Sequence, residues 1–127
     1  MLQYINKLKQ EKRIYFYHNP TKAELVYFYK NARALIHPSL SEGFGLPIIE
    51  AVYFQLPIIA SDIAVFKELL DNKYVQFNPT SAQDMAGKIN DFIGSKTKAN
   101  KANLLAKFSF EKMTKETLDL YFEALSN

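Results

Sequence analysis

The residues best suited to chemistry lie between Glu42 and Glu50, where two carboxylates flank a pair of glycines. Gly43 and Gly45 lack a Cβ, so a ligand can approach their backbone amides closely. The chain from Pro47 onward is predicted to form a short helix, whose first N–H groups are unpaired and carry partial positive charge. Such a helix end suits a phosphate, whereas carboxylates accept hydrogen bonds from sugar hydroxyls. The stretch therefore offers amides for a diphosphate and carboxylates for sugars on either side.

The same stretch also has a purely structural interpretation, in which a glycine loop leads into a capped helix and both glutamates are solvated. A short glycine loop before a helix is a weak signal by itself. Pro47 fits this interpretation too, because its missing N–H costs nothing at the first position of a helix. The surrounding elements must therefore help to decide between a ligand site and a plain loop.

Short β-rich runs alternate with helical segments along most of the chain. The predicted strands are Ile14–Tyr17, Ala34–His37, Pro57–Ala60 and Tyr74–Phe77. The predicted helices are 2–10, one starting at Thr21, Ile48–Phe54, Ile63–Leu70, Ala82–Ile93, Lys98–Lys107 and one capped by Ser109. Strands that alternate with helices through short turns indicate an α/β fold with a parallel β-sheet and flanking helices.

Polar residues at three helix starts are predicted to be N-caps. Thr21 is followed three residues later by Glu24, which is the spacing of a capping box. Ser81 and Asp84 have the same spacing, and Asp62 is expected to cap the helix that follows it. These caps sharpen the boundaries of the predicted helices.

Three loops are expected to meet at one edge of the sheet. In parallel sheets, ligands bind beyond the carboxyl ends of the strands. The glycine loop directly follows the strand Ala34–His37, and the other two loops are His18–Pro20 and Ser61–Asp62. Within the glycine loop, Ser39 and Ser41 are expected to bond the backbone. This convergence favours the ligand interpretation.

The composition indicates one domain and excludes several kinds of site. A chain of 127 residues with 48% hydrophobic residues can bury a core. Because there is no cysteine and only two distant histidines, no metal site is expected. The net charge of +3 permits an anionic ligand but does not suggest nucleic acid. No apolar run could cross a bilayer and no signal peptide follows Met1, so a cytoplasmic location is expected.

Residues 34–51, Ala-Leu-Ile-His-Pro-Ser-Leu-Ser-Glu-Gly-Phe-Gly-Leu-Pro-Ile-Ile-Glu-Ala, resemble the donor-site signature of the group 1 (family 4) retaining glycosyltransferases. Those enzymes have the GT-B fold, and their signature contains two glutamates separated by seven residues, as Glu42 and Glu50 are here. The likeness covers most of the chain. It includes Ile14–Tyr17, Glu24, Leu25, Tyr29, Leu56–Ser61, Glu68, Phe77–Pro79, Phe108–Phe110 and Tyr121.

The resemblance implies a role for each part of the glycine loop. Glu42 would be the catalytic carboxylate that binds hydroxyls of the donor sugar, and Glu50 would bind the ribose hydroxyls. The turn at His18 and Asn19 lies where the family packs the nucleotide base, although a plain turn residue is the simpler interpretation of His18. The sugar and diphosphate would contact the amides of Gly43, Phe44, Gly45 and Leu46. The donor is a nucleoside diphosphate sugar, and no metal or other cofactor is required.

Parts of the family pattern have no match. The family uses an Arg and a Lys to stabilise the leaving diphosphate, and Lys12 and Arg13 occupy the wrong place for that pair. Gln55 stands where the family usually has glycine, so that helix end must be capped differently. The acceptor-binding N-terminal domain and the first two strands of the donor domain are also without a match. Residues 1–127 therefore resemble a single truncated, Rossmann-like donor-binding domain.

This truncation leaves three functions open. The first is a donor-binding part of a glycosyltransferase, expected to be inactive alone and to need an N-terminal acceptor domain or a companion chain. The second is a non-catalytic module that folds and self-associates. The third is a related nucleotide-sugar epimerase, which the Glu-Gly-Phe-Gly-Leu-Pro wording fits less well.

The missing strands also lead to an expectation about the sheet. In the family's strand order, 3-2-1-4-5-6, Ile14–Tyr17 and Ala34–His37 match strands three and four. Pairing them directly would give four parallel strands in sequence order, since a bare gap would leave backbone groups unpaired. Helices starting at Thr21, Pro47 and Asp62 would then share one face. The other face is expected to be buried in a homodimer or covered by a C-terminal helix.

Overall fold

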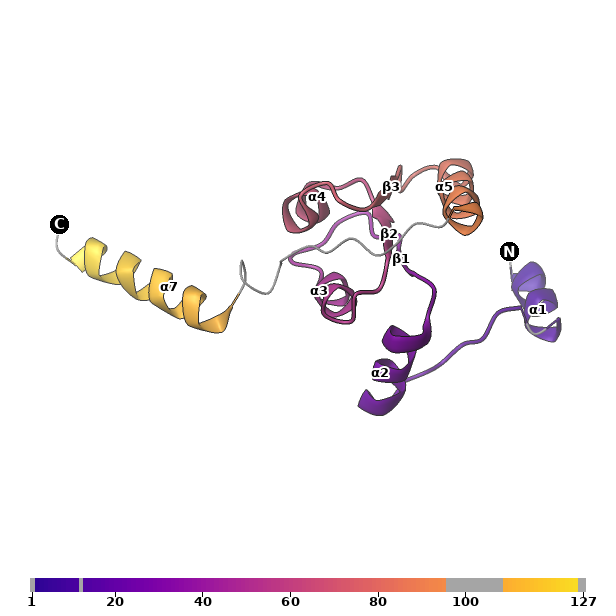
Figure 1. Cartoon of the computed structure of the whole chain (residues 1–127), viewed down its shortest axis with the longest axis horizontal. Helices are drawn as coiled ribbons and strands as arrows, with labels where there is room; N and C mark the ends of the chain where they lie inside the picture. Colours follow the sequence, from indigo (N-terminus) through magenta and orange to yellow (C-terminus); the bar gives the residue numbers. More distant parts are fainter. Residues whose placement is uncertain (1, 12, 96–108, 126–127) are drawn as a thin grey trace.

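The computed structural model describes residues 2–11, 13–95 and 109–125 (Figure 1). Its elements are α1 (Leu2–Gln10), α2 (Lys22–Asn31), β1 (Leu35–His37), α3 (Leu46–Tyr53), β2 (Ile58–Ser61), α4 (Ala64–Leu70), β3 (Val75–Phe77), α5 (Ala82–Gly94) and α7 (Phe110–Leu125). The helix predicted at Lys98–Lys107 lies outside the described residues.

A parallel sheet of three strands, in the order β1-β2-β3, forms the centre of the described structure. Ile59 in the middle strand lies opposite Ile36 on one side and Val75 on the other. All four residues of β2 are buried, because an apolar parallel strand needs cover on both of its faces. The predicted α/β class, with a parallel sheet and flanking helices, is confirmed.

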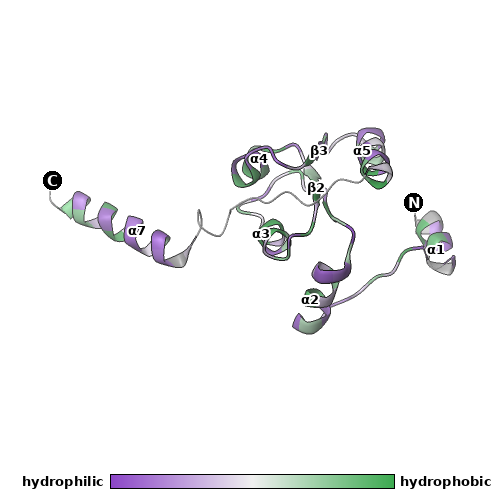
Figure 2. Ribbon diagram, in the orientation of Figure 1, coloured by the Kyte–Doolittle hydropathy of each residue, from purple (hydrophilic) through white to green (hydrophobic). Residues whose placement is uncertain are grey.

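Two apolar layers enclose this sheet. On one face, Ile48 and Ala51 of α3 pack in the same cluster as Phe66 and Leu70 of α4. On the other face, Phe92 of α5 packs against residues of β2 and β3. Figure 2 shows that α3 and α4 are mainly apolar, whereas α7 alternates between polar and apolar residues. Burying each large apolar side chain contributes about 1.5–3 kcal/mol, so these layers hold the fold together.

The strand predicted at Ile14–Tyr17 is wrong, and with it the four-stranded sheet. The segment runs between α1 and α2 without pairing with β1 (Figure 1). The side chains of Tyr15, Phe16 and Tyr17 are exposed, and the Tyr17 ring packs edge-on against Phe28 of α2 at a centroid distance of 4.7 Å. A β-rich run becomes a strand only where a partner edge is within reach. Here the ring contact holds the run beside α2.

The last helix stands apart from the sheet (Figure 1). Residues 111–125 are exposed along their whole length, so the helix that covers the second face is α5 and not α7. The exposed apolar residues of α7 include Met113, Leu118, Tyr121, Phe122 and Leu125. Among the described residues, no helix has the length and apolar character needed to cross a bilayer.

The predicted helix starts are confirmed in two cases and corrected in a third. Thr21 and Glu24 form the full capping box of α2. Ser81 caps α5, where its Oγ accepts from the Asp84 N–H at 3.2 Å. Asp62, however, does not cap α4. Its carboxylate forms an ion pair with Lys67. The N-cap of α4 is Ile63, whose side chain forms no capping hydrogen bond.

The end of α3 shows how the chain manages without a glycine. Gln55 adopts a left-handed conformation with φ of 57°. Its N–H donates to the Val52 carbonyl at 3.0 Å, and the Leu56 N–H donates to the Ala51 carbonyl at 2.8 Å. These two bonds are the Schellman pair, which normally has glycine at the left-handed position. Gln55 therefore differs from the usual glycine in residue type and not in backbone conformation.

We expect Gln55→Gly to stabilise the fold by about 1 kcal/mol, because the left-handed conformation costs a residue with a Cβ about 1–2 kcal/mol and glycine loses some of that gain in chain entropy. Urea unfolding measures the change in the free energy of unfolding. Gln55→Ala is the control, since it keeps the Cβ and should not stabilise. Equal stabilisation by both variants would show that the side chain, and not the backbone conformation, is responsible.

Candidate functional site

The glycine loop connects the carboxyl end of β1 to the start of α3, and its shape depends on Gly45. This residue is buried and left-handed, with φ of 83°. A Cβ added here would lie 2.9 Å from Cε1 of the Phe66 ring, so only glycine fits. Gly43 differs, because a Cβ there would meet nothing within 4 Å. Gly45 is thus required by the packing against Phe66, whereas Gly43 faces open space.

Helix α3 begins at Leu46, two residues before the predicted range Ile48–Phe54, and Pro47 occupies its second position. Gly45 is the N-cap and forms no side-chain cap, so the first N–H groups of the helix are not satisfied by a capping side chain. Phe44 and Leu46 on either side of Gly45 are exposed. The four residues predicted to contact a diphosphate therefore form a continuous turn at the helix start.

Glu42 is held by two partners at the end of β1. Its Oε1 accepts a hydrogen bond from the Ser39 Oγ at 2.6 Å and lies 3.1 Å from the His37 Nε2. The Ser39 bond, followed by the His37 bond, lowers the pKa of the Glu42 carboxyl. Glu42 is therefore ionised at neutral pH. Its second oxygen, Oε2, takes part in neither contact and can accept from a ligand hydroxyl.

The partners of Glu42 were not identified from the sequence. Ser39 was expected to bond the loop backbone, but its hydroxyl bonds the Glu42 carboxylate. His37 is the last residue of β1, and its ring packs against Phe66 at a centroid distance of 5.3 Å. Their closeness in the sequence could have identified them, because His37 and Ser39 precede Glu42 by only five and three residues.

Glu50 lies in α3 and is held by a residue of α2. The Tyr29 hydroxyl donates to the Glu50 Oε2 at 2.7 Å. The Tyr29 ring is stacked on Phe54 with a centroid distance of 5.6 Å and an interplanar angle of 6°. Burial, together with the bond to Glu50, raises the pKa of the Tyr29 phenol. Tyr29 therefore stays protonated and remains a donor at any physiological pH.

The other two predicted loops differ in their relation to this site. Ser61, at the end of β2, is buried and its Oγ donates to the His37 carbonyl at 3.4 Å. The Tyr74 hydroxyl donates to the Ser61 carbonyl at 3.1 Å. The ends of β1 and β2 are thus linked. His18 and Asn19 lie exposed in the turn before α2, and no described hydrogen bond joins them to the glycine loop.

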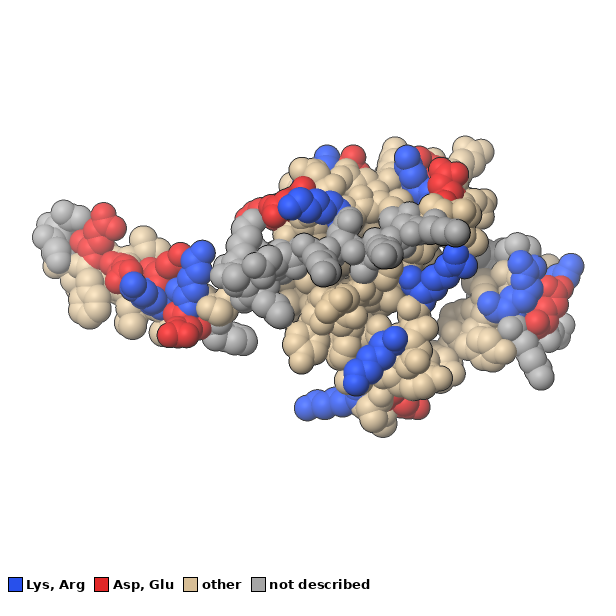
Figure 3. Space-filling model, in the orientation of Figure 1, with Lys and Arg blue, Asp and Glu red and all other residues tan. Residues whose placement is uncertain are grey.

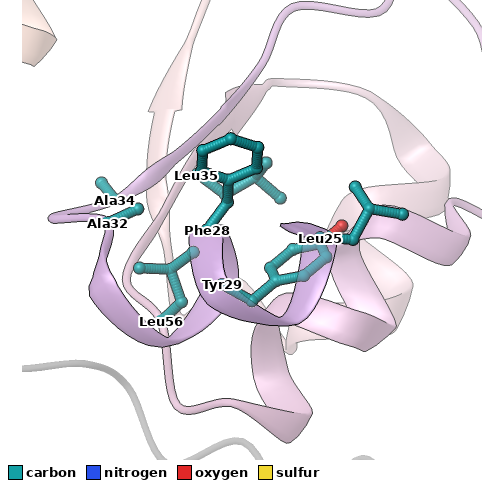
Figure 4. Close-up of a pocket in the computed structure, with 7 residues that line it drawn as sticks. All are labelled: Leu25, Phe28, Tyr29, Ala32, Ala34, Leu35 and Leu56. Atoms are coloured by element: carbon teal, nitrogen blue, oxygen red, sulfur yellow. The ribbon is translucent and has the colours of Figure 1, made fainter. Parts of the chain in front are cut away.

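A shallow pocket of about 210 Å³ lies beside Tyr29, between α2 and β1 (Figure 4). Its lining residues are Leu25, Phe28, Tyr29, Ala32, Ala34, Leu35 and Leu56. This lining is almost entirely apolar and has no charged group for a phosphate. The pocket therefore does not suit a nucleotide.

On the face drawn in Figure 3, the described basic side chains lie apart from one another over several elements. Arg13 pairs with Glu11 at 3.7 Å, and the Arg33 Nη2 donates to the Ile93 carbonyl at 2.6 Å. Lys67 pairs with Asp62. Each of these three cations bonds a group outside the glycine loop, and no described contact joins any of them to that loop. The part of the chain that the structure describes also holds no cluster of metal-binding side chains.

Known proteins resemble this chain over most of its length. It is 35% identical over 114 residues to the O-antigen chain mannosyltransferase RfbU of Salmonella typhimurium strain LT2, which covers 87% of this chain and 32% of RfbU. It is 39% identical over 82 residues to the serotype-specific mannosyltransferase WbdA of Escherichia coli, covering 65% of this chain and 10% of WbdA. The O-antigen biosynthesis glycosyltransferase WclY of Escherichia coli is 31% identical over 88 residues, 67% of this chain and 24% of WclY. The chain thus spans about a third or less of these relatives.

The family comparison covers the glycine loop and the whole described sheet. Residues 1–107 match the family described as glycosyl transferases group 1. The match includes both glutamates, the turn into α3 and all three strands. The chain therefore belongs to the group 1 glycosyl transferases, and it is related to O-antigen mannosyltransferases.

Proposed function

We propose that this chain binds a nucleoside diphosphate sugar and supplies the donor-binding part of a retaining glycosyltransferase. The observation that carries the proposal is the pair of oriented carboxylates on either side of the turn into α3. Glu42 is bonded to Ser39 and His37, and Glu50 is bonded to Tyr29. Between them lie the amides of a left-handed turn and the start of a helix. Family membership supports a donor sugar at Glu42 and a ribose at Glu50.

Each part of the loop has a separate task in the proposed reaction. The amides of residues 43–46 and the positive end of α3 stabilise the charge that grows on the leaving diphosphate. Glu42 binds hydroxyls of the transferred sugar and holds its reacting carbon in place for the acceptor hydroxyl. Glu50 fixes the ribose. The acceptor site comes from an acceptor-binding domain or a companion chain. The remaining charge stabilisation comes from a basic pair that the family places earlier in the donor domain.

The relatives suggest which donor to test first. RfbU and WbdA are both described as mannosyltransferases. A nucleotide-linked mannose is therefore the first donor that we propose for this chain. We assign the contacts to the nucleotide base to His18 and Asn19. They lie exposed in the turn before α2, and no described bond joins that turn to the glycine loop.

A second candidate function is a self-associating module that no longer transfers sugar. It is favoured by the exposed apolar side chains of α7, among them Tyr121, Phe122 and Leu125. A surface of this kind often marks an association site. Association that depends on protein concentration, with no binding of any nucleotide, would select this function over donor binding.

We expect Glu50→Gln to weaken nucleoside diphosphate binding by about 1–3 kcal/mol, the usual loss when a hydrogen bond to a charged group is removed. Glu42→Gln should weaken binding of the nucleotide sugar and leave the bare diphosphate nearly unchanged, because Glu42 contacts only the sugar. Calorimetric titration with matched pairs of diphosphate and nucleotide sugar measures both effects. Glu116→Gln on the exposed α7 is the control. If both variants lose equal affinity for both ligands, the division of tasks is wrong.

We also expect a polypeptide of these 127 residues to show no measurable sugar transfer by itself. Arg13, Arg33 and Lys67 each bond a group outside the glycine loop, and nothing in the described residues forms an acceptor site. The measurement is release of nucleoside diphosphate from labelled donor in the presence of candidate acceptors. Multiple turnovers that Glu42→Ala abolishes would refute this expectation.

A further inference from the structure

Tyr29 contacts α3 and the C-cap residue that follows it. Its hydroxyl donates to the Glu50 Oε2 at 2.7 Å, and its ring is stacked on Phe54. Glu50 and Phe54 are four residues apart, so they lie one above the other on the helix surface. Tyr29 is 21 residues away from Glu50 in sequence and reaches both from α2. It therefore connects the orientation of α2 to the position of one carboxylate.

This contact restricts a side chain that would otherwise be mobile. Glu50 is exposed on α3, and an exposed glutamate loses rotamer entropy when a ligand orders it. The Tyr29 bond orders the carboxylate before a ligand arrives, and such preorganisation increases affinity. Each carboxylate oxygen accepts more than one hydrogen bond. Oε1 and the remaining acceptor site of Oε2 are therefore available to ribose hydroxyls.

The ring of Tyr29 is fixed independently of its hydroxyl. The ring is partly buried against the core and lines an apolar pocket together with Leu25, Phe28 and Leu56 (Figure 4). Phe54 covers it by stacking. A phenylalanine would keep all of these contacts. The hydroxyl consequently adds little to the packing, and its one described partner is the Glu50 carboxylate.

We propose that Tyr29 is a positioning residue that orients the Glu50 carboxylate toward the ribose hydroxyls of the donor nucleotide. This inference rests on the proposed function, because it gives Glu50 the ribose. It adds a residue outside the glycine loop that determines how tightly the site binds a ribonucleotide and how strongly it rejects a nucleotide without ribose hydroxyls.

The test compares Tyr29→Phe with the unchanged protein by calorimetric titration. ADP, CDP, GDP and UDP are screened first, and the tightest of them is then compared with its 2′,3′-dideoxy form. We expect Tyr29→Phe to weaken binding of the ribonucleotide by about tenfold, the loss of one good hydrogen bond. The dideoxy nucleotide should bind the variant and the unchanged protein equally, because it has no hydroxyls for Glu50 to hold.

Two controls separate positioning from packing. Tyr53→Phe removes a phenol hydroxyl from a ring that also touches Phe54, edge-on at a centroid distance of 5.0 Å, and it should leave both affinities unchanged. In a Glu50→Gln background, Tyr29→Phe should cause no further loss, since the two residues act as one unit. The thermal midpoint of Tyr29→Phe should stay close to that of the unchanged protein.

The outcomes distinguish this inference from the function on which it rests. Equal weakening of the ribonucleotide and the dideoxy nucleotide by Tyr29→Phe would mean that Tyr29 is only structural, and the inference would be overturned. It would also be overturned if Glu50→Gln weakened ribonucleotide binding while Tyr29→Phe did not. If the unchanged protein bound none of the four diphosphates, the proposed function would fail and the inference with it.

Discussion

The contact between Gly45 and the Phe66 ring is the constraint on which the rest of the site depends. The loop after β1 must turn into α3 beside a buried aromatic ring. A Cβ at Gly45 would lie 2.9 Å from Cε1 of that ring, so there is no room for one. Phe66 also packs against the His37 ring, which in turn contacts Glu42. Contacts thus run from the hydrophobic core through Phe66 and His37 to the Glu42 carboxylate. A rigid core beneath an open loop is what a site needs if its amides are to keep their geometry without a ligand.

The two carboxylates are oriented by different means, and this difference fits their proposed tasks. Glu42 is held within its own loop by Ser39 and His37, and its lowered pKa keeps it ionised beside the sugar. Glu50 is held from outside by Tyr29, so its position depends on how α2 packs on α3. A change in α2 would therefore alter the ribose end of the site and leave the sugar end intact.

What could be predicted from the sequence was mainly what local chemistry determines. The capping box of Thr21 and the glycine turn before α3 depend on residues close together in the chain, and both were predicted. The strands β1 to β3 were predicted from their local apolar runs, although they pair residues far apart in the sequence. The strand at Ile14–Tyr17 was wrong because β-propensity does not reveal whether a partner edge is within reach. The Tyr29 bond to Glu50 joins residues from separate helices, so only the packing of α2 on α3 could reveal it.

The central claim is that the turn from Gly43 to Leu46 binds the diphosphate of a nucleotide sugar. The most direct measurement is the backbone amide spectrum of ¹⁵N-labelled protein, recorded while a nucleoside diphosphate is added. We expect the largest shifts at the amides of Gly43, Phe44, Gly45 and Leu46, with smaller ones along the first turn of α3. Saturable binding that shifts amides of α7 or α1 and leaves these four unchanged would contradict the claim.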